Sequence, residues 1–506
     1  MNLRFILSGL CFFTVLLILF VAPALAKYSG GSGEPNDPYL ISTADDMDQI
    51  GINSSDWGKY FKLTNDINLS VYRSNAFNRI GVSPSLSFSG VFDGNNHTIF
   101  GFTYNCMNCG NIGIFGYVSA AGRIENIFLV DANIIGQAYV GGLVGYNEGT
   151  ITNCYLSGIV AGVPGSDYIG GLAGNNTGTI SNCYLTVSIT GHLTIGGLVG
   201  KNDGGSIEKC FVSGSVGDGN SSEQIGGLAG INYGDIHDCH YTGSVTSGRF
   251  SSNIGGLVGV DGNVGHITSG CSSTGTVNVG INSHNIGGLA GLNNGPVTQC
   301  FSTAEVVGGI DSRCLGGLVG TNNDGNISNC YSTGNVTGEN PVGGLAGANG
   351  SPTHRSPAVI SNCYSTGSVV GNISGGLVGA NSADVNNCYF LDIAGPNNGA
   401  GISLTDAQMK HQASFFSWDF VWETANGTND VWAICEGVSY PKLAWQFIVG
   451  DSDNDKDVDF SDFAELANKW MQADSTLYCG GTDLTGDGLV DLNDLAAFVQ
   501  NWLQGF

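Results

Sequence analysis

The chain has 506 residues, and only 11% of them are charged, against roughly a quarter in an average soluble domain. Hydrophobic residues make up 42% and glycine contributes 81 residues, so the chain has enough apolar material for a core and is not a disordered polymer. The formal net charge of −26 disfavours nucleic acid and anionic membrane surfaces as partners and favours cations.

Residues 1–26 have the features of a secretory signal peptide. Arg4 supplies the basic start, residues 5–21 are mostly apolar, and Ala24-Leu25-Ala26 is a small-residue cleavage site. The alternative is a retained membrane anchor, for which the apolar run is short. We therefore expect a secreted or cell-surface protein with no membrane span after cleavage.

Residues 27–110 form a strand-rich segment ahead of the repeats. Its sequences YFKLTNDINLS and FSGVFDGNNHTI consist of short β-prone runs that Gly and Asn interrupt. We expect this segment to cap the first coil of a repeat array, because an uncovered end would expose strand edges and core.

Residues 111–390 are built from one repeated unit. The pentapeptide Gly-Gly-Leu-Val/Ala-Gly recurs every 26 to 32 residues, and residues 111–116 are a degenerate first copy. Intact copies begin at Gly141, Gly170, Gly196, Gly226, Gly255, Gly287, Gly316, Gly343 and Gly375. Most copies continue with an Asn-Cys-aromatic element, as in GGLVGYNEGTITNCYLSGIV.

Short β-branched and aromatic runs cut by Gly and Asn favour strands and turns, and the helical period of 3.6 is absent from this region. One repeat has the length of one coil of a β-solenoid. We predict a mainly β protein, a right-handed β-solenoid of about ten coils, with a small α-helical calcium-binding domain at its C-terminus.

The repeats resemble the GLUG-motif repeats of bacterial exported proteins. The resemblance extends from about residue 111 to residue 388 and rests on the intact GGL(V/A)G element and on the Asn-Cys-Tyr element of many copies. It implies a surface or secreted repeat protein, sometimes attached to peptidase or adhesin modules, and implies no particular reaction.

The fourth position of the pentapeptide alternates strictly between Val and Ala. Either a two-coil unit was duplicated, or large and small side chains alternate along a ladder to fill space. The residues are Val144, Ala173, Val199, Ala229, Val258, Ala290, Val319, Ala346 and Val378.

Nine cysteines occupy one equivalent position in successive repeats. Buried free thiols acting as small hydrophobic groups are the favoured interpretation, and a metal-binding row of thiolates is the alternative. These residues are Cys154, Cys183, Cys210, Cys239, Cys271, Cys300, Cys330, Cys363 and Cys388. A separate pair, Cys106 and Cys109, is expected to form a local disulfide.

Residues 391–448 no longer follow the repeat. Residues 404–416 have helical spacing, and the following stretch contains Trp422, Trp432, Tyr440 and Trp445. We interpret the segment as an aromatic C-terminal cap, with sugar binding by stacking as the alternative.

Residues 449–506 hold two acidic loops 32 residues apart, DSDNDKDVDFSD and DLTGDGLVDLND. In the first loop the candidate metal ligands are Asp451, Asp453, Asp455, Asp457 through its carbonyl, Asp459 and Asp462. In the second they are Asp483, Thr485, Asp487, Leu489 through its carbonyl, Asp491 and Asp494. Oxygen ligands at alternate positions of a short loop are what Ca²⁺ requires, so we expect two calcium sites.

Each acidic loop leads into an amphipathic helix, and we expect the two apolar stripes to pack on each other. The stripes are Phe463, Leu466, Ala467 and Trp470, matched by Leu495, Phe498, Val499 and Trp502.

This tandem of loop and helix resembles a type I dockerin, an EF-hand-like module, over about residues 450–503. The resemblance implies a cohesin-like protein or another surface component as partner, within a system linked to polysaccharide breakdown. Two features depart from the family pattern: Lys456 stands where the first loop would have Gly, and Phe460-Ser461 and Leu492-Asn493 replace the usual small hydroxyl pair.

The sequence favours a non-catalytic, secreted, calcium-binding repeat protein that docks to an extracellular assembly, with a polysaccharide as an additional partner. The alternatives are a polysaccharide lyase or glycosidase on a β-helix, and a surface adhesin. A lyase needs clustered basic residues, whereas the few Lys and Arg residues of the repeats stand at unrelated offsets. We identify no candidate catalytic residue.

Overall fold

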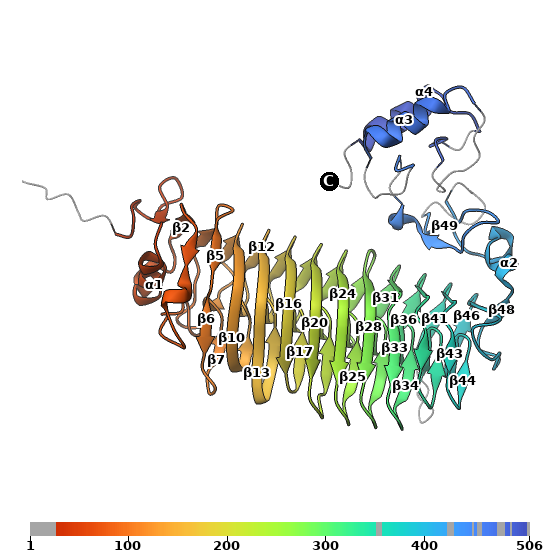
Figure 1. Ribbon diagram of the computed structural model, residues 1–506, viewed down its shortest axis with the longest axis horizontal. Helices are drawn as coiled ribbons and strands as arrows, with labels where there is room; N and C mark the ends of the chain where they lie inside the picture. Colours follow the sequence, from red (N-terminus) through yellow and green to blue (C-terminus); the bar gives the residue numbers. More distant parts are fainter. Residues whose placement is uncertain are drawn as a thin grey trace, which may run out of the picture.

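The computed structural model describes residues 27–350, 357–421, 430–447, 450–452, 458–472, 481–485 and 488–502. The protein is a β-solenoid of about 11 turns, followed by an irregular segment and two short helices (Figure 1). The predicted mainly β solenoid is therefore confirmed. The predicted signal peptide lies outside the described residues.

Each turn of the solenoid contributes strands to three parallel sheets, in which every strand pairs with its counterpart in the next coil. The first sheet contains β1 (Tyr39–Ile41), β2 (Tyr60–Leu63), β4 (Val91–Asp93), β9 (Arg123–Glu125), β12 (Thr150–Thr152), β15 (Thr179–Ser181), β19 (Ser206–Glu208), β23 (Asp235–His237), β27 (His266–Thr268), β31 (Pro296–Thr298), β36 (Asn326–Ser328), β41 (Val359–Ser361) and β46 (Asp384–Asn386). The second contains β8 (Phe115–Val118), β11 (Val144–Asn147), β14 (Ala173–Asn176), β18 (Val199–Asn202), β22 (Ala229–Asn232), β26 (Val258–Asp261), β30 (Ala290–Asn293), β35 (Val319–Asn322), β40 (Ala346–Asn349) and β45 (Val378–Asn381).

The third sheet follows the Asn-Cys element of each repeat and carries the face that meets the C-terminal segment. It contains β3 (Ile67–Asn68), β5 (Thr98–Phe100), β6 (Thr103–Asn105), β7 (Gly110–Ile112), β10 (Phe128–Val140), β13 (Tyr155–Gly170), β16 (Tyr184–Gly191), β17 (Thr194–Gly196), β20 (Phe211–Asp218), β21 (Gln224–Gly226), β24 (His240–Ser247), β25 (Ser252–Gly255), β28 (Ser272–Val279), β29 (His284–Gly287), β32 (Phe301–Ser302), β33 (Glu305–Gly308), β34 (Arg313–Gly316), β37 (Tyr331–Ser332), β38 (Val336–Thr337), β39 (Val342–Gly343), β42 (Tyr364–Ser365), β43 (Val369–Val370), β44 (Ser374–Gly375), β47 (Tyr389–Leu391) and β48 (Ile402–Leu404).

The core is a stack of side-chain ladders along the solenoid axis. The alternating Val and Ala residues pair directly from coil to coil, as in Val144 with Ala173 and Ala173 with Val199, and all are fully buried. Large and small side chains thus alternate within one buried ladder. This arrangement fits both explanations of the alternation.

The first Gly of the pentapeptide is required because the backbone of its own coil three residues later and the backbone of the next coil both lie too close for a side chain. A methyl group placed on Gly226 would lie 2.0 Å from the carbonyl oxygen of Ala229 and 2.7 Å from that of Leu257. These distances are far below van der Waals contact, so any larger residue would push the coils apart.

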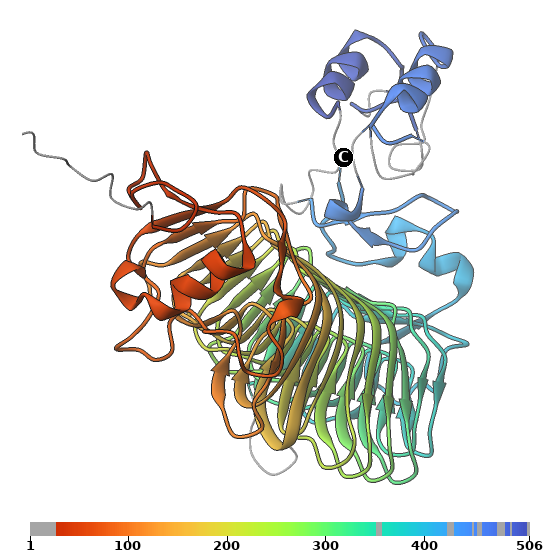
Figure 2. The ribbon, with the colours of Figure 1, turned by 60° about the vertical axis from the view of Figure 1, so that its left-hand side comes forward.

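The N-terminal segment continues the solenoid and also covers its end. Strands β1, β2 and β4 extend the first sheet, and helix α1 (Ala44–Ile52) lies across the N-terminal end (Figure 2). Thr43 and Asp46 form a capping box at the start of α1, while Met47 and Ile50 are fully buried. The 3₁₀ turns η1 (Ser54–Asp56) and η2 (Leu69–Val71) complete this part.

The C-terminal segment, here called the flank cap, consists of the described residues between 391 and 447 and lies along the side of the solenoid. It contains α2 (Asp406–Met409), η3 (Gln412–Ser414), η4 (Ala444–Gln446) and the antiparallel pair β49 (Trp432–Ala433) and β50 (Lys442–Leu443). Trp445 reaches back to donate a hydrogen bond from Nε1 to the carbonyl oxygen of Gln299, 146 residues earlier. The cap therefore covers a flank as well as the end of the rod, which the sequence did not indicate.

Helices α3 (Phe460–Asn468) and α4 (Leu492–Gln500) lie beside each other beyond the flank cap (Figures 1 and 2). They correspond to the two amphipathic helices predicted after the acidic loops. The predicted helical spacing of residues 404–416 gives only the one-turn helix α2, because chain segments on either side are drawn onto the solenoid flank.

Candidate functional site

The two acidic loops end in the same helix-capping geometry. Asp459 caps α3 and accepts a hydrogen bond from the Ser461 amide at 2.6 Å, and Asp491 caps α4 and accepts one from the Asn493 amide at 2.7 Å. A carboxylate in this position satisfies free amides and complements the helix dipole. Asp459 and Asp491, both predicted as ligands, therefore also act as helix caps.

The last carboxylate of each loop is buried and closes the loop. Asp494 is fully buried and accepts from the Asp491 amide at 2.7 Å, and from the Thr485 amide at 2.9 Å and hydroxyl at 3.0 Å. Asp462 accepts equivalent hydrogen bonds from the Asp459 amide and from Ser452. The Thr485 hydroxyl, a predicted ligand, uses its proton in this network, which leaves its oxygen lone pairs for a cation.

Gly488 makes the sharp turn of the second loop. Its φ of +90° is in the region that favours glycine, and its amide donates to Asp483 Oδ2 at 2.7 Å. Lys456, at the same position of the first loop, lies outside the described residues.

The described ligands supply only oxygen donors, which fits Ca²⁺ and no soft metal. Asp451, Asp459, Asp462, Asp483, Thr485, Leu489, Asp491 and Asp494 are described, whereas Asp453, Asp455, Asp457 and Asp487 lie outside the described residues. Within the described part of the chain, no three His, Cys, Asp or Glu side chains are close enough together to hold a metal ion. The full ligand sets therefore remain predictions.

The core of this module differs from the predicted packing of two complete stripes. Leu466 and Phe498 are buried, together with Val458, Leu484 and Val490 from the loops. Of the predicted stripe residues, Phe463, Ala467, Trp470 and Val499 are exposed. The buried positions that we expected these residues to fill are filled by two valines and a leucine of the loops. This happens because the loops, and not only the helices, pack against the small core.

Two large apolar side chains stand exposed at equivalent positions of the module. Phe460 and Leu492 are the first residues of α3 and α4, and their side chains are 76% and 71% exposed. Val499 of α4 is 61% exposed. A module with so small a core leaves these side chains in solvent, and such exposure is typical of a surface that contacts a partner.

The row of nine cysteines consists of free, buried thiols. The thiols donate to nearby carbonyl oxygens, as Cys300 does to Thr298 at 3.1 Å and to Ile267 of the preceding coil at 3.7 Å. This supports the interpretation as small hydrophobic groups. Cys106 and Cys109 form the expected local disulfide.

A second row, here called the aromatic row, runs along the outer face of the third sheet directly after the cysteines. Its members pair in register from coil to coil, and all but His240 and Ser272 are Phe or Tyr. The row is Phe128, Tyr155, Tyr184, Phe211, His240, Ser272, Phe301, Tyr331, Tyr364 and Tyr389.

The flank cap buries the C-terminal part of the aromatic row. Trp432 is fully buried and lies 5.9 Å from the ring of Tyr364, and Trp418 stacks on Trp432 at 4.4 Å. The hydroxyl of Tyr364 donates to the Pro441 carbonyl oxygen. The aromatic cluster predicted from the sequence is thus a structural cap, although Trp422 lies outside the described residues.

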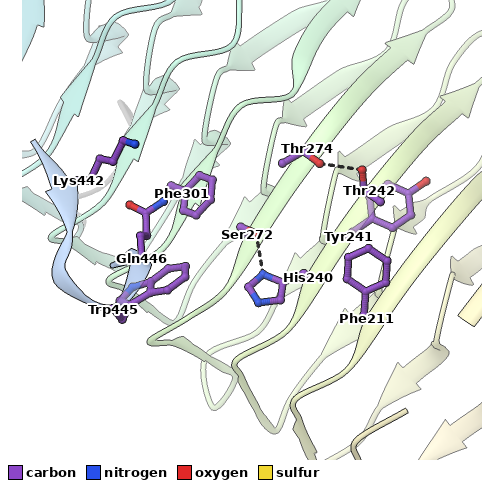
Figure 3. A pocket seen from close by; sticks show the side chains of 10 residues that line it. All are labelled: Phe211, His240, Tyr241, Thr242, Ser272, Thr274, Phe301, Lys442, Trp445 and Gln446. Carbon is purple, nitrogen blue, oxygen red and sulfur yellow. Dashed lines mark hydrogen bonds between the residues drawn. The ribbon is translucent and has the colours of Figure 1, made fainter. Parts of the chain in front are cut away.

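A groove opens where the flank cap stops and the aromatic row emerges (Figure 3). It has a volume of about 530 Å³ and is lined by Phe211, His240, Tyr241, Thr242, Ser272, Thr274, Phe301, Lys442, Trp445 and Gln446. His240 Nδ1 and the Ser272 hydroxyl lie 2.8 Å apart, and Thr274 donates to Thr242 at 2.9 Å. The Trp445 ring lies 5.8 Å from that of Phe301 and 6.2 Å from that of His240.

Sequence reasoning missed this groove. Its signal is the residue after each row cysteine, which is aromatic in the other coils and becomes His240 and then Ser272 in the middle of the array. The small side chain of Ser272 leaves a gap in the aromatic row. The contribution of Trp445 and Gln446 could not be found, because nothing local indicates that the chain returns to this coil.

Six segments of the chain match the GLUG motif, namely residues 136–161, 165–190, 191–217, 221–246, 311–337 and 339–370. The predicted GLUG repeats are therefore confirmed. All six segments lie in the solenoid.

Two curated relatives are similar to this chain over a limited length. The chain is 34% identical to halomucin of Haloquadratum walsbyi over 137 residues, which is 26% of this chain and 2% of halomucin. It is 30% identical over 161 residues to a “Putative Gly-rich membrane protein” of Evansella cellulosilytica, which is 30% of this chain and 18% of that protein. The chain thus spans a small part of either relative.

A solved structure from Bacteroides ovatus, described as a “putative immunoglobulin A1 protease”, aligns with 83% of this chain and 96% of its own. The sequence identity is 18% and the TM-score is 0.34, too low to bear on function. Separately, no helix among the described residues is long and apolar enough to cross a membrane.

Proposed function

We propose that this GLUG repeat protein is a non-catalytic rod of the cell exterior that docks to a protein partner through a calcium-stabilised C-terminal module. The observation that carries the proposal is the duplication of one geometry: each acidic loop closes on a buried carboxylate, and the helix that follows begins with an exposed apolar residue. Two equivalent surfaces on one small module suit the recognition of a folded partner.

Calcium has a clear structural role in this proposal. Asp462 and Asp494 are both almost fully buried, and the loops that they close are dense in negative charge. Self-repulsion would open such loops in the absence of a cation, so binding of Ca²⁺ and folding of the module are coupled. The predicted ligands that lie outside the described residues would complete the two sites.

The extracellular location is supported by the signal-peptide features of residues 1–26 and by the second relative, whose description names a membrane protein. The dockerin resemblance adds a cohesin-like protein or another surface component as the partner, in a system linked to polysaccharide breakdown. An adhesin, or a carbohydrate-active enzyme carrying the same module, is the competing function.

The test for calcium uses isothermal titration of the full mature chain. We expect two Ca²⁺ ions per chain for the wild type and a loss of one site in Asp494→Asn. Asp384→Asn, which changes an exposed carboxylate of the solenoid, is the matched control and should still bind two ions. Binding that is unchanged in Asp494→Asn would contradict the assignment of the second site.

The test for docking immobilises the full chain and exposes it to culture supernatant of the producing cells, with calcium or with chelator. Capture of one protein should require calcium and disappear in the double variant Phe460→Ser/Leu492→Ser. The control variant Ile393→Ser removes an apolar side chain that is 82% exposed outside the module and should not affect capture. Capture that ignores calcium or the double substitution overturns the proposal, and release of sugar from a polysaccharide by the chain would favour the enzyme.

A further inference from the structure

The groove beside the aromatic row has the size and composition of a ligand site that is separate from the C-terminal module. Its volume of about 530 Å³ is in the range of small-molecule sites, about 300–1,000 Å³. Ser272 creates it, because this residue interrupts the row and leaves a gap between the rings of His240 and Phe301. Trp445 of the flank cap forms one wall of the gap (Figure 3).

The groove offers aromatic surface and hydroxyl or amide groups together. Phe211, Phe301 and Trp445 provide apolar rings, while Thr242, Thr274 and Gln446 provide hydrogen-bond donors and acceptors. Sugars have the complementary character, with an apolar C–H face for stacking on a ring and hydroxyl groups around the edge.

The charges select among sugars. None of the residues lining the groove is Asp or Glu, and Lys442 is its one formally charged lining residue among those described. The chain as a whole carries a net charge of −26, which repels acidic polysaccharides. A cationic sugar would find no carboxylate in the groove, and an acidic sugar would be repelled by the chain as a whole. A neutral sugar is therefore favoured.

The groove also continues along the solenoid. A second hollow of about 240 Å³ shares Lys442 with it and is lined by Thr303, Tyr331, Thr333, Tyr364 and Tyr440. The coils are spaced by about 4.8 Å, so a ligand that follows the seam meets a threonine at each step. A chain of sugar rings fits this shape better than a single ring.

We propose that the seam between the aromatic row and the flank cap is a binding site for a neutral oligosaccharide chain. The flank cap already occupies the buried part of the row with its own aromatic rings, and the sugar chain takes the part that the cap leaves open. The site is a binding site only, because the lining residues supply no pair of carboxylates for hydrolysis.

The test is titration of the full mature chain with cellohexaose, xylohexaose, mannohexaose and an oligogalacturonate of the same length, followed by calorimetry. At least one neutral hexasaccharide should bind at one site per chain, and Phe211→Ala and His240→Ala should each raise its Kd about tenfold. Tyr184→Ala is the matched control, because Tyr184 is 56% exposed in the same row and does not line the groove.

Several outcomes would overturn this site. They are no binding of any neutral hexasaccharide, tighter binding of the oligogalacturonate, or equal effects of the Tyr184 and His240 substitutions. Thermal unfolding of each variant verifies that it folds. The assay needs neither calcium nor a protein partner, so its failure is distinguishable from failure of the docking proposal.

A second inference rests on an independent feature, a ladder of asparagines at the last positions of the strands of the second sheet, of which all members except the exposed Asn381 are buried. In this ladder each Nδ2 donates to the Oδ1 of the next coil at 2.8 or 2.9 Å. The ladder contains Asn147, Asn176, Asn202, Asn232, Asp261, Asn293, Asn322, Asn349 and Asn381. Only Asp261 is not an asparagine.

Asp261 breaks the pattern of donors and acceptors. Its Oδ1 accepts from Asn232, but a carboxylate has no N–H to pass to Asn293, its partner in register. Asp261 Oδ2 and Asn293 Oδ1 are both buried and without a hydrogen-bond partner. Two unpartnered acceptors in adjacent rungs are costly unless a proton joins them.

We infer that Asp261 is held as a neutral carboxylic acid whose hydroxyl donates to Asn293 Oδ1 and completes the ladder. Burial raises the pKa of Asp261 to about 8, partly opposed by the hydrogen bond from Asn232. The side chains that face it are the amides Asn232 of β22 and Asn293 of β30, and the adjoining backbone of Gly265 and Gly295 carries no titratable group.

The sign of the pH dependence follows from the raised pKa. In the unfolded chain Asp261 has a pKa of about 3.9, so between pH about 4 and about 8 the folded state binds more protons than the unfolded state. Stability is therefore greatest at the acidic side of this window and decreases as the pH rises through it.

The test compares Tm of the wild type and Asp261→Asn from pH 5 to pH 9. Asparagine supplies the missing N–H at every pH, so the advantage of the variant in Tm should be smallest at pH 5 and should grow as the pH rises, by about 3 °C or more at pH 8.5. Asp384→Asn, at an exposed position, should show no such divergence. In parallel, the infrared spectrum of the wild type at pH 6 should contain a protonated-carboxyl band, since exposed carboxyls are ionised there. A constant difference in Tm, or absence of the band, would overturn the inference.

Discussion

At the scale of single residues, the Asn of the Asn-Cys element is explained by backbone conformation. The residue before each row cysteine has a positive φ near 50°, or is Gly270, and asparagine tolerates this conformation better than other side chains. The coils use Asn153, Asn182, Asn329, Asn362 and Asn387 there, but Lys209, Asp238 and Gln299 in three others. Lys209 and Gln299 are sites of backbone strain, whereas aspartate tolerates this conformation much as asparagine does.

Lys209→Asn should stabilise the solenoid by up to about 1 kcal/mol, because asparagine relieves the left-handed strain. The exposed ion pair of Lys209 with Glu208 at 3.5 Å that the substitution removes contributes little. Denaturant unfolding measures the effect. The reverse substitution Asn182→Lys, at a φ of 52° against 51° for Lys209, is the matched control and should destabilise by a similar amount. Equal midpoints for all three proteins would contradict this explanation.

At the scale of elements, parallel strands place equivalent residues of successive repeats in direct contact along the axis, so one repeat position becomes one row. The consequence for the cysteines is a continuous line of buried thiols. Burial raises the pKa values of Cys183 and Cys210 well above the ordinary range, so these thiols stay protonated at neutral and mildly alkaline pH. A protonated thiol is a poor nucleophile.

The native chain should therefore resist alkylation along the row. With iodoacetamide at pH 8, we expect negligible modification of Cys183 and Cys210 and faster modification of Cys314, which is only partly buried. Peptide mapping by mass spectrometry gives the extent at each site. In denaturant all of them should react, and equal rates in the native state would show that the thiols are accessible.

At the scale of the whole molecule, the flank cap joins distant parts of the chain. Its aromatic rings bury Tyr331, Tyr364 and Tyr389, and its last turn reaches the coil of Gln299. The cap thereby covers apolar surface that the last coils would otherwise expose and also forms one wall of the groove. Its stability and the shape of the groove are thus linked.

Trp432→Ala should destabilise the flank cap by about 3–5 kcal/mol, because it leaves a cavity among fully buried rings. Trp432→Phe keeps most of the ring and removes an indole N–H that has no hydrogen-bond partner, so its cost should be much smaller. Limited proteolysis between residues 391 and 447, with thermal unfolding, measures both. Similar behaviour of the two variants would argue against a packing role for Trp432.

Much of the fold could be predicted from the sequence because the solenoid is built from contacts between neighbouring repeats. The spacing of the pentapeptide gave the coil, and the fixed position of Cys154 and its equivalents gave one buried row. The candidate calcium loops were recognisable for the same reason, since one whole acidic loop, Asp483 to Asp494, occupies twelve consecutive positions. The coil, the cysteine row and the acidic loop can all be recognised from the spacing of residues that are close together in the sequence.

Burial within the C-terminal module could not be predicted in the same way. Helical spacing grouped Phe463 and Val499 with Leu466 and Phe498, but only the latter two are buried. Which side of an amphipathic helix is covered depends on what packs against it, and here the loops supply Val458 and Val490. The periodicity of a helix does not specify which segment of the chain packs against it.

The sequence by itself determined the solenoid, its ladders and the acidic composition of the two loops, because each depends on residues within one repeat or one loop. Only the tertiary structure decided that the flank cap returns along the rod, that Trp445 faces the gap at Ser272, and that Asp261 meets Asn293 without a donor between them. Those contacts join residues that are 32 to 173 positions apart, and their free energy depends on how the coils and the cap are placed in space.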